Sequence, residues 1–351
     1  MGSDKHLVIA AAGTGGHVMP GLAVAAEMIA RGWEVSWLGT EAGMEKMLVS
    51  KKGIEFDAVD FSGVRGHGLA GAVSGAVKLA KAFFSTGGYI AVPSAIAAHR
   101  MGIPAVVMNC DAASLLSVRL VLPFIDALAC GFEGEAAERG GKKAVVTGNP
   151  VRQEITKIDP PSERFAGRGG RLRLLVFGGS LGARFLNHLL PKAISLLPSD
   201  SRPEIIHQCG FKAVDEVKAL YAEAGVEAAV QPFIEDMAAA YTWSDLVLCR
   251  AGATSVSEIC SAGAASLLVP LVVKTTSHQL QNALFMEQNG ASRCLRQDTL
   301  TPERLSAVLA SIDRAQLLSM AEAARKLSHS NAASAVADMI ESRADRTFRV
   351  S

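Results

Sequence analysis

The chain has 351 residues, a length that suits two domains of ordinary size. Hydrophobic residues make up 49% of it and charged residues 20%, so the composition supports extensive buried sheets and excludes global disorder. The formal net charge of +1 gives no indication of a nucleic-acid partner, because such a partner is normally bound by a strongly basic face.

No export signal and no membrane span are expected. An apolar segment that reads as a strand begins near His6, without the charged and apolar stretches of a signal peptide. No apolar run reaches the roughly 18–20 residues that a transmembrane helix needs. The 6 cysteines lack CxxC spacing, which indicates reduced, mostly buried thiols in a cytoplasmic protein rather than a metal site.

The N-terminal segment is predicted to form a strand, a glycine turn, a helix and a second strand. Residues 7–11 are apolar and form the first strand, and residues 13–16 (GTGG) form the turn. Apolar residues at helical spacing follow over 21–30, and the second strand is expected at 34–38. This order is a βαβ unit with its glycine turn at the carboxyl end of the first strand.

The same pattern occurs again in mid-chain, where a strand over 171–177 precedes the glycine turn GGSLG and a helix. Two such beginnings predict an α/β protein with two tandem Rossmann-like, doubly wound domains and a cleft between them. The proline- and glycine-rich stretch 151–170 is the expected boundary. We therefore expect an N-terminal domain over residues 1–155, a C-terminal domain over 156–335, and a tail over 336–351 that could pack back on the first domain.

The second half alternates regularly after its glycine turn. Strands are expected at 203–208, 226–230, 245–249 and 265–269, and helices at 213–224, 235–240, 255–262 and 278–289. The first half is less regular. Residues 66–84 read as a helix whose apolar face and two lysines could rest on anionic lipid or, equally, pack in a core. This interpretation leaves almost no room for a strand between Phe84 and Gly87.

The first glycine turn could approach a ligand closely. Thr14, Gly15 and Gly16 precede a helix whose first N–H groups would be open to an anion. His17 on the first helical turn could accept a proton, which makes it the candidate catalytic residue. A tight structural turn with a packing histidine is the alternative. Nicotinamide binding is another, although GTGGH is not GxGxxG and Glu41 only approximates the required acid.

Two further strand-to-helix turns lie in the second half. The turn 178–182 (GGSLG) is placed to hold a diphosphate at the sheet edge. In the stretch 249–258, a helix N-terminus could bind phosphate and Glu258 could accept ribose hydroxyls. The amide-rich helix start 278–282 (HQLQN) suits sugar hydroxyls. An ordinary turn, a solvated glutamate and a polar helix face are the respective alternatives.

Together these stretches resemble the MurG family, the peptidoglycan N-acetylglucosaminyltransferases of GT-B fold. Such enzymes join N-acetylglucosamine from its UDP donor to a membrane-bound muramyl-pentapeptide diphosphoryl-polyprenol. The matching stretches run in the family's order across nearly the whole chain: GTGGHVMPGLAVA (13–25), GVRGHG (63–68), TGNPVR (147–152), FGGSLGAR (177–184), PFIEDMAAAY (232–241), CRAGATSVSEICSAG (249–263) and HQLQNA (278–283).

The resemblance implies a role for each matching residue. His17 and its loop would face the acceptor, and Thr14, Gly15 and Gly16 would also border the donor. The other donor-binding residues that it implies are Gly179 and Ser180 at the diphosphate, Arg152 nearby, Phe233 and Ile234 around the uracil, Arg250 supporting the pocket, Glu258 at the ribose and Gln279 at the sugar.

The implied reaction is an inverting transfer in which the acceptor's sugar hydroxyl attacks the anomeric carbon of UDP-N-acetylglucosamine. No cofactor and no metal are expected, because the family lacks a DxD pair and would stabilise the leaving UDP with helix N-termini and basic side chains. The implied acceptor is the lipid-linked peptidoglycan precursor, which the transfer converts from lipid I to lipid II. The implied location is peripheral, on the anionic cytoplasmic face of the bacterial plasma membrane.

Two departures from the family lie in the N-terminal half. The strand that normally precedes the GGY segment has no room before Gly87, so we predict that it is absent; further on, Pro-Gly-Gly is replaced by residues 93–95 (PSA). The family's His-Glu-Gln-Asn is replaced by residues 108–111 (MNCD), which leaves Asn109 and Asp111 as the candidates on the acceptor side. A UDP-sugar-binding relative with lost or altered transfer is therefore one alternative, and an NAD(P)-dependent oxidoreductase is another.

Overall fold

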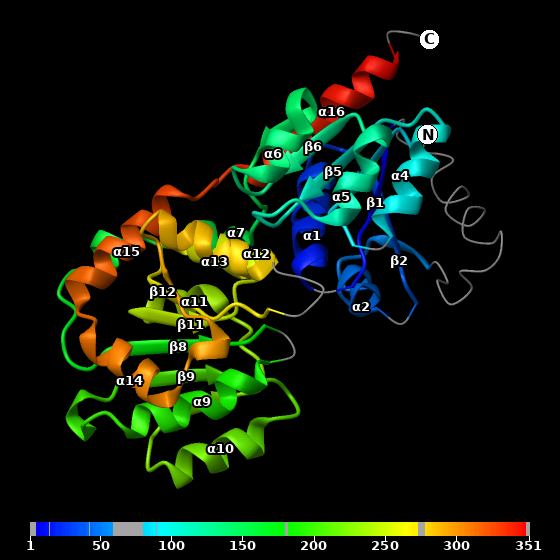
Figure 1. Ribbon diagram of the computed structural model, residues 1–351. Helices are drawn as coiled ribbons and strands as arrows, with labels where there is room; N and C mark the ends of the chain where they lie inside the picture. Colours follow the sequence, from blue (N-terminus) through cyan, green and yellow to red (C-terminus); the bar gives the residue numbers. More distant parts are fainter. Residues whose placement is uncertain are drawn as a thin grey trace. The chain divides into compact units, whose positions relative to one another are not determined.

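The computed structural model describes residues 5–13, 15–41, 43–58, 80–88, 90–179, 182–272 and 278–348. The chain divides into two compact units, which we call unit 1 (Met1–Val151 with His329–Ser351) and unit 2 (Arg152–Ser328). Each unit has its own parallel sheet flanked by helices (Figure 1). The prediction of two doubly wound α/β domains is therefore confirmed.

Among its described residues, unit 1 contains a 7-stranded parallel sheet in the order β3-β2-β1-β4-β5-β6-β7. Its strands are β1 (His6–Ala10), β2 (Glu34–Gly39), β3 (Glu55–Ala58), β4 (Ala82–Ser85), β5 (Ala105–Asn109), β6 (Ala127–Cys130) and β7 (Ala144–Val146). Its helices are α1 (Gly15–Ala30), α2 (Met44–Ser50), α4 (Ala91–Arg100), α5 (Leu116–Val121), α6 (Glu135–Gly140) and α16 (Ala332–Phe348). Helix α1 packs against α2 and α16, and α4 packs against α5. The strand order reverses between β1 and β4, which is where such sheets bind ligands.

Strand β4 shows that the prediction of an absent strand is wrong. Residues 82–85 (AFFS) are fully buried and pair in parallel with β1 on one side and with β5 on the other. A strand covered on both faces is apolar throughout, so its sequence lacks the alternation that distinguishes a strand from a helix end. The helix predicted over 66–84 is therefore wrong at its end, and residues 66–79 lie outside the described part of the chain.

Helix α16 belongs to unit 1, and charged groups fix it to the end of α1. Arg31 Nη1 donates hydrogen bonds to Asp338 (2.6 Å) and Glu341 (2.8 Å). The indole Nε1 of Trp33 donates to the other oxygen of Glu341 at 2.9 Å. The tail that packs on unit 1 thus begins a few residues earlier than the expected boundary, at His329.

In the part of unit 2 that the structure describes, a 6-stranded parallel sheet has the order β10-β9-β8-β11-β12-β13. Its strands are β8 (Arg173–Phe177), β9 (Glu204–Gln208), β10 (Ala229–Gln231), β11 (Leu246–Cys249), β12 (Ser266–Leu268) and β13 (Arg293–Cys294). Its helices are α7 (Gln153–Thr156), α8 (Pro161–Phe165), α9 (Arg184–Ser195), α10 (Val214–Glu223), α11 (Met237–Trp243), α12 (Ala253–Ala262), α13 (His278–Gln288), α14 (Pro302–Ser311) and α15 (Arg314–Lys326). Helix α9 packs against α10 and α14, and α12 packs against α13 and α15. The order reverses between β8 and β11. In the described residues of both units, no helix is long and apolar enough to cross a lipid bilayer.

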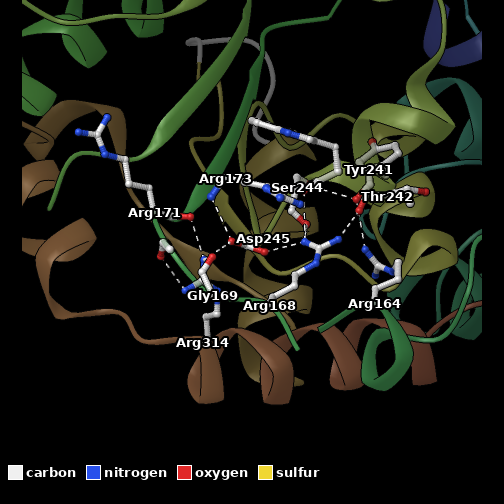
Figure 2. A network of polar contacts seen from close by, with 12 residues as sticks. Arg164, Arg168, Gly169, Arg171, Arg173, Tyr241, Thr242, Ser244, Asp245 and Arg314 are labelled. Atoms are coloured by element: carbon white, nitrogen blue, oxygen red, sulfur yellow. Dashed lines mark hydrogen bonds and ion pairs between the residues drawn. The ribbon is translucent and has the colours of Figure 1, made fainter. Parts of the chain in front are cut away.

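Asp245 anchors the amino ends of the two central strands of unit 2. Its fully buried carboxylate accepts hydrogen bonds from Arg168 Nη1 (2.6 Å), Arg314 Nη2 (3.1 Å) and the backbone N–H of Arg173 (3.1 Å). Figure 2 shows both guanidinium groups converging on it. Asp245 directly precedes β11 and Arg173 begins β8, so this network lies at the sheet edge opposite the glycine turns.

We expect Asp245→Ala to lower the free energy of unfolding by about 3–5 kcal/mol, because it removes a fully buried carboxylate and leaves two partly buried guanidinium groups without their partner. Urea denaturation followed by circular dichroism measures this change. Asp298→Ala is the matched control, since Asp298 pairs with Arg296 at the exposed surface and should leave the denaturation midpoint unchanged. Equal midpoints for the two variants would show that the Asp245 network does not stabilise the fold.

Candidate active site

In unit 1, His17 and Thr86 pair across the point where the strand order reverses. His17 lies on the first turn of α1, after β1, and Thr86 directly follows β4. The Nδ1 atom of His17 lies 2.8 Å from the carbonyl oxygen of Thr86, and the Thr86 hydroxyl donates to the carbonyl oxygen of His17 at 2.7 Å. A carbonyl oxygen only accepts, so Nδ1 carries the proton and Nε2 is the basic nitrogen of the neutral ring.

Two glycines after β4 allow the backbone to approach the His17 ring. Gly87 and Gly88 have φ angles of +101° and +81°, a backbone conformation that residues with a Cβ atom rarely adopt. A Cβ on Gly87 would lie 3.3 Å from the His17 ring, and one on Gly88 would lie 2.9 Å from the carbonyl oxygen of Ala12. The absence of side chains at Gly87 and Gly88 therefore lets the backbone after β4 lie close to the His17 ring and to the end of β1.

Glu45 holds the beginning of the first glycine turn. This fully buried carboxylate accepts hydrogen bonds from the hydroxyl (2.6 Å) and N–H (3.1 Å) of Thr40 and from the N–H of Gly13 (3.4 Å). Gly43 leaves room for it, since a Cβ there would lie 2.1 Å from a carboxylate oxygen. Glu41, the acid considered for a ribose, is exposed and paired with Lys46 instead.

The two acceptor-side candidates lie at the end of β5. Asn109 is fully buried, and its amide donates to the carbonyl oxygens of Asp111 (2.5 Å) and Ala113 (3.1 Å) and accepts from the N–H of Leu115 (3.2 Å). Its amide thus holds the loop after β5. Asp111 is also buried, and burial together with its charge raises the pKa of the neighbouring Cys110 thiol. Their positions alone do not show that Asn109 or Asp111 takes the role of a glutamate, and their contact with an acceptor stays a prediction.

In unit 2, the turn after β8 is built so that only glycine fits at several positions. A Cβ on Gly178 would lie 2.2 Å from the N of Ala183, and one on Gly182 would lie 2.0 Å from the carbonyl oxygen of Cys209. Gly179 has a φ angle of +82°. The turn leads directly into α9, as a diphosphate site requires. The predicted ligands Ser180 and, in unit 1, Thr14 lie outside the described residues, and Gly15 and Gly16 begin α1.

Beside the turn after β11, the buried Glu258 and Tyr241 form a polar cluster with Arg152, whose side chain is 31% exposed. Glu258 Oε1 accepts from Arg152 Nε at 2.9 Å and lies 2.8 Å from Nη2, and the Tyr241 hydroxyl lies 3.5 Å from Oε2. Burial raises the pKa of Glu258, and the Arg152 charge opposes that rise. Two residues predicted from separate motifs are therefore in contact, and Glu258 is held in one orientation on α12.

The remaining polar candidates, Arg250 and Gln279, contact the loop after β12. Arg250 Nη1 donates to the carbonyl oxygen of Val269 at 3.1 Å, its guanidinium lies 5.9 Å from the centre of the Phe185 ring, and burial lowers its pKa. Gln279 Oε1 accepts from the N–H of Leu271 at 2.9 Å. Both side chains thus hold backbone or ring groups, and their predicted contacts with a donor stay predictions.

The predicted uracil segment follows β10. Phe233 is partly exposed and stacks on the exposed ring of Phe211, with 6.2 Å between ring centres and 13° between planes. Ile234 is buried, and its N–H donates to Gln208 Oε1 at 3.4 Å.

Sequence reasoning missed four contributors to these arrangements. Thr86 was missed because the strand before it, β4, was expected to be absent. The two glycines that follow it, Gly87 and Gly88, were the visible sign of a strand-to-helix turn. Glu45, Tyr241 and Gln208 act through contacts distant in sequence, and only the position of Gln208 at a strand end could have indicated it.

Comparison with known proteins agrees with this geometry. The model of the glycosyltransferase family 28 N-terminal domain matches residues 7–128, and that of the C-terminal domain matches residues 173–341. The two matches cover most of both sheets. The protein is therefore a glycosyltransferase.

Similar proteins narrow the class further. A UDP-N-acetylglucosamine--N-acetylmuramyl-(pentapeptide) pyrophosphoryl-undecaprenol N-acetylglucosamine transferase of Methylibium petroleiphilum is 50% identical over 97% of this chain and 98% of its own length. The transferase of the same name from Chromobacterium violaceum is 49% identical over 97% and 98%. The crystal structure of Acinetobacter baumannii MurG is 34% identical, with a TM-score of 0.83 over 96% of this chain and 99% of that one. The chain belongs to the MurG family, and these relatives favour neither the nicotinamide-dependent alternative nor the donor-binding relative without transfer.

Arg152→Ala tests the pairing of Arg152 with the buried Glu258 through the pH dependence of stability. Without Arg152 nothing comparable opposes burial, so the pKa of Glu258 rises further. A carboxyl group with a raised folded-state pKa contributes stability that is complete below its unfolded value of about 4.3 and is lost as the pH rises through the folded value. We expect the free energy of unfolding to fall by about 1–3 kcal/mol at pH 7 and by less at pH 4.

Urea denaturation at several pH values measures this loss. The control is Arg152→Ala/Glu258→Gln, which removes the buried charge and should recover most of the stability at pH 7. If the single and double variants unfold alike at every pH, the Arg152 charge does not oppose the rise in the pKa of Glu258.

Proposed function

We propose that this protein transfers N-acetylglucosamine from UDP-N-acetylglucosamine to the muramyl sugar of the lipid-linked peptidoglycan precursor, which converts lipid I to lipid II. The observation that carries the proposal is the sequence identity of 50% and 49%, over 97% of the chain, to two transferases named for this reaction. The glycine turns at the points where the strand order reverses in both units support it. The transfer inverts the anomeric carbon and needs no covalent intermediate.

His17 is the proposed general base. The carbonyl oxygen of Thr86 holds the proton on Nδ1, so Nε2 can take the proton from the attacking sugar hydroxyl. The hydroxyl oxygen forms the new bond to the anomeric carbon as the bond to the UDP oxygen breaks. The leaving diphosphate gains negative charge, which the N–H groups at the starts of α9 and α12 are suited to stabilise.

The donor is proposed to lie along the carboxyl edge of unit 2. In this arrangement the diphosphate contacts the turn of Gly179 and Ser180, and the uracil contacts Phe233 and Ile234. Glu258, fixed by Arg152, would accept the ribose hydroxyls through Oε2, which is only loosely engaged by Tyr241 at 3.5 Å.

The protein is further proposed to work peripherally at an anionic membrane surface, where its lipid acceptor is located. Leu116 and Leu120 lie one helical turn apart on α5 and are 71% and 54% exposed. Arg100 ends α4, which packs against α5, and Met101 directly follows it; they add an exposed basic and an exposed apolar side chain. Apolar side chains beside basic ones are typical of surfaces that rest on anionic lipid.

His17→Ala should lower the rate of transfer by about 10²–10⁴-fold, the usual contribution of a general base, and leave donor affinity unchanged. Transfer to a short-chain analogue of the lipid acceptor measures the rate, and calorimetry with UDP-N-acetylglucosamine measures the affinity. His99→Ala is the control, because His99 is exposed on α4 and contacts Phe124. Full activity of His17→Ala would exclude the histidine as base. Donor binding by the unaltered protein without any transfer would instead support a relative that has lost catalysis.

Leu116→Asp/Leu120→Asp should weaken binding to phosphatidylglycerol vesicles by at least about tenfold, since each leucine buried in lipid contributes roughly 1.5–3 kcal/mol. Co-sedimentation with vesicles measures the binding. Leu196→Asp changes an equally exposed leucine of unit 2 and should bind like the unaltered protein. Vesicle binding that survives the double substitution would place the membrane contact elsewhere.

A further inference from the structure

Gln208 occupies the last position of β9, between the two loops that the proposed function assigns to the donor. In the sheet, β9 lies between β8 and β10. The Gln208 side chain is buried, so its amide requires hydrogen-bond partners. It bonds to one loop on each side.

The nitrogen and the oxygen of the Gln208 side-chain amide contact the loops that follow two different strands. Its Nε2 donates to the carbonyl oxygen of Gly179 at 2.8 Å, in the glycine turn after β8. Its Oε1 accepts from the N–H of Ile234 at 3.4 Å, in the segment after β10. One neutral side chain therefore connects the turn proposed for the diphosphate to the segment proposed for the uracil.

The backbone on both sides of Gln208 is fixed, so the reach of its side chain is fixed as well. His207 Nδ1 lies 3.0 Å from the Tyr221 hydroxyl, and burial lowers the pKa of His207 to about 4. Cys209 donates its N–H to Gln231 at 3.0 Å, and its carbonyl oxygen lies against Gly182. A shorter asparagine would not span the two loops, and a glutamate could not donate to Gly179.

We propose that Gln208 is a positioning residue that sets the spacing between the diphosphate turn and the uracil segment before the donor arrives. This inference rests on the proposed donor site. Loops that already have the bound spacing lose less conformational entropy when the ligand binds, so the two parts of UDP bind as one. The bond to Ile234 is long and hence weak, which leaves that N–H able to turn to a nucleobase carbonyl.

The test uses the full-length protein and displacement of a fluorescent UDP analogue by UDP and by uridine. Gln208→Met keeps the side-chain volume and removes both hydrogen bonds. We expect it to raise the Kd for UDP by about tenfold or more and the Kd for uridine by less than about threefold, because only UDP uses both loops. The donor KM should rise with the UDP Kd, while kcat changes less.

Gln208→Glu separates the two hydrogen bonds. It can still accept from Ile234, but it cannot donate to Gly179 and adds negative charge beside the diphosphate turn. UDP affinity should fall further than in Gln208→Met, with uridine affinity nearly unchanged. Equal weakening of UDP and uridine in both variants, or no weakening of UDP, would overturn the inference.

Asp245→Ala is the control for general destabilisation, since it loosens unit 2 at the opposite sheet edge. It should lower the melting temperature without changing the Kd for UDP, and a comparable loss of UDP affinity in this variant would overturn a specific role for Gln208. The proposed function is tested separately by the unaltered protein, which must bind UDP. Its failure to bind would contradict the donor site itself, whatever the Gln208 variants do.

Discussion

The pairing of His17 with Thr86 requires β4 to lie directly beside β1. Thr86 directly follows β4, and His17 lies on the first turn of α1, the helix after β1, so the two residues meet only where the carboxyl ends of two adjacent strands diverge. The same constraint operates in unit 2, where the ends of β8 and β11 carry the glycine turn and the loop before Glu258. In each unit the strand order thus decides which loops can share a ligand, and local sequence only decides what those loops contain.

The parts of the fold and site that were predictable depend on local chemistry. A glycine turn between a strand and a helix is visible in sequence because backbone conformation demands glycine, as at Gly178 and Gly182. Glu258 could be identified because it follows such a turn. Contacts made through the sheet could not be predicted: Glu45 reaches Gly13 and Gln208 reaches Ile234 only after the strands have assembled. Strand β4 was missed for a related reason, since a short apolar run covered on both faces has no periodicity of its own.

Three of the buried acids, Asp245, Glu258 and Glu45, are stabilised in different ways. Asp245, at the amino edge of its sheet, has two guanidinium partners and a backbone N–H, so its charge is fully engaged in holding strands together. Glu258, at the carboxyl edge, has one guanidinium partner and one long contact to a hydroxyl. Glu45 is held by N–H and hydroxyl donors of its own unit. Glu258 thus has one guanidinium partner where Asp245 has two, which is consistent with a carboxylate kept ready for a ligand.

The return of α16 to unit 1 makes unit 2 an insertion within the chain of unit 1. The chain leaves unit 1 after Val151 and re-enters it at His329. The two segments are in contact there, because a Cβ on Gly148 would lie 2.2 Å from the Cβ of His329. Unit 2 is therefore a continuous segment that can be excised and expressed from one open reading frame. Unit 1 cannot be obtained by truncation, because a chain that stops before His329 loses the helix that covers α1. A minimal unit 1 would have to be engineered by joining the segments that end at Val151 and begin at His329 with a short linker, and the contact at Gly148 shows that this linker would have little distance to span.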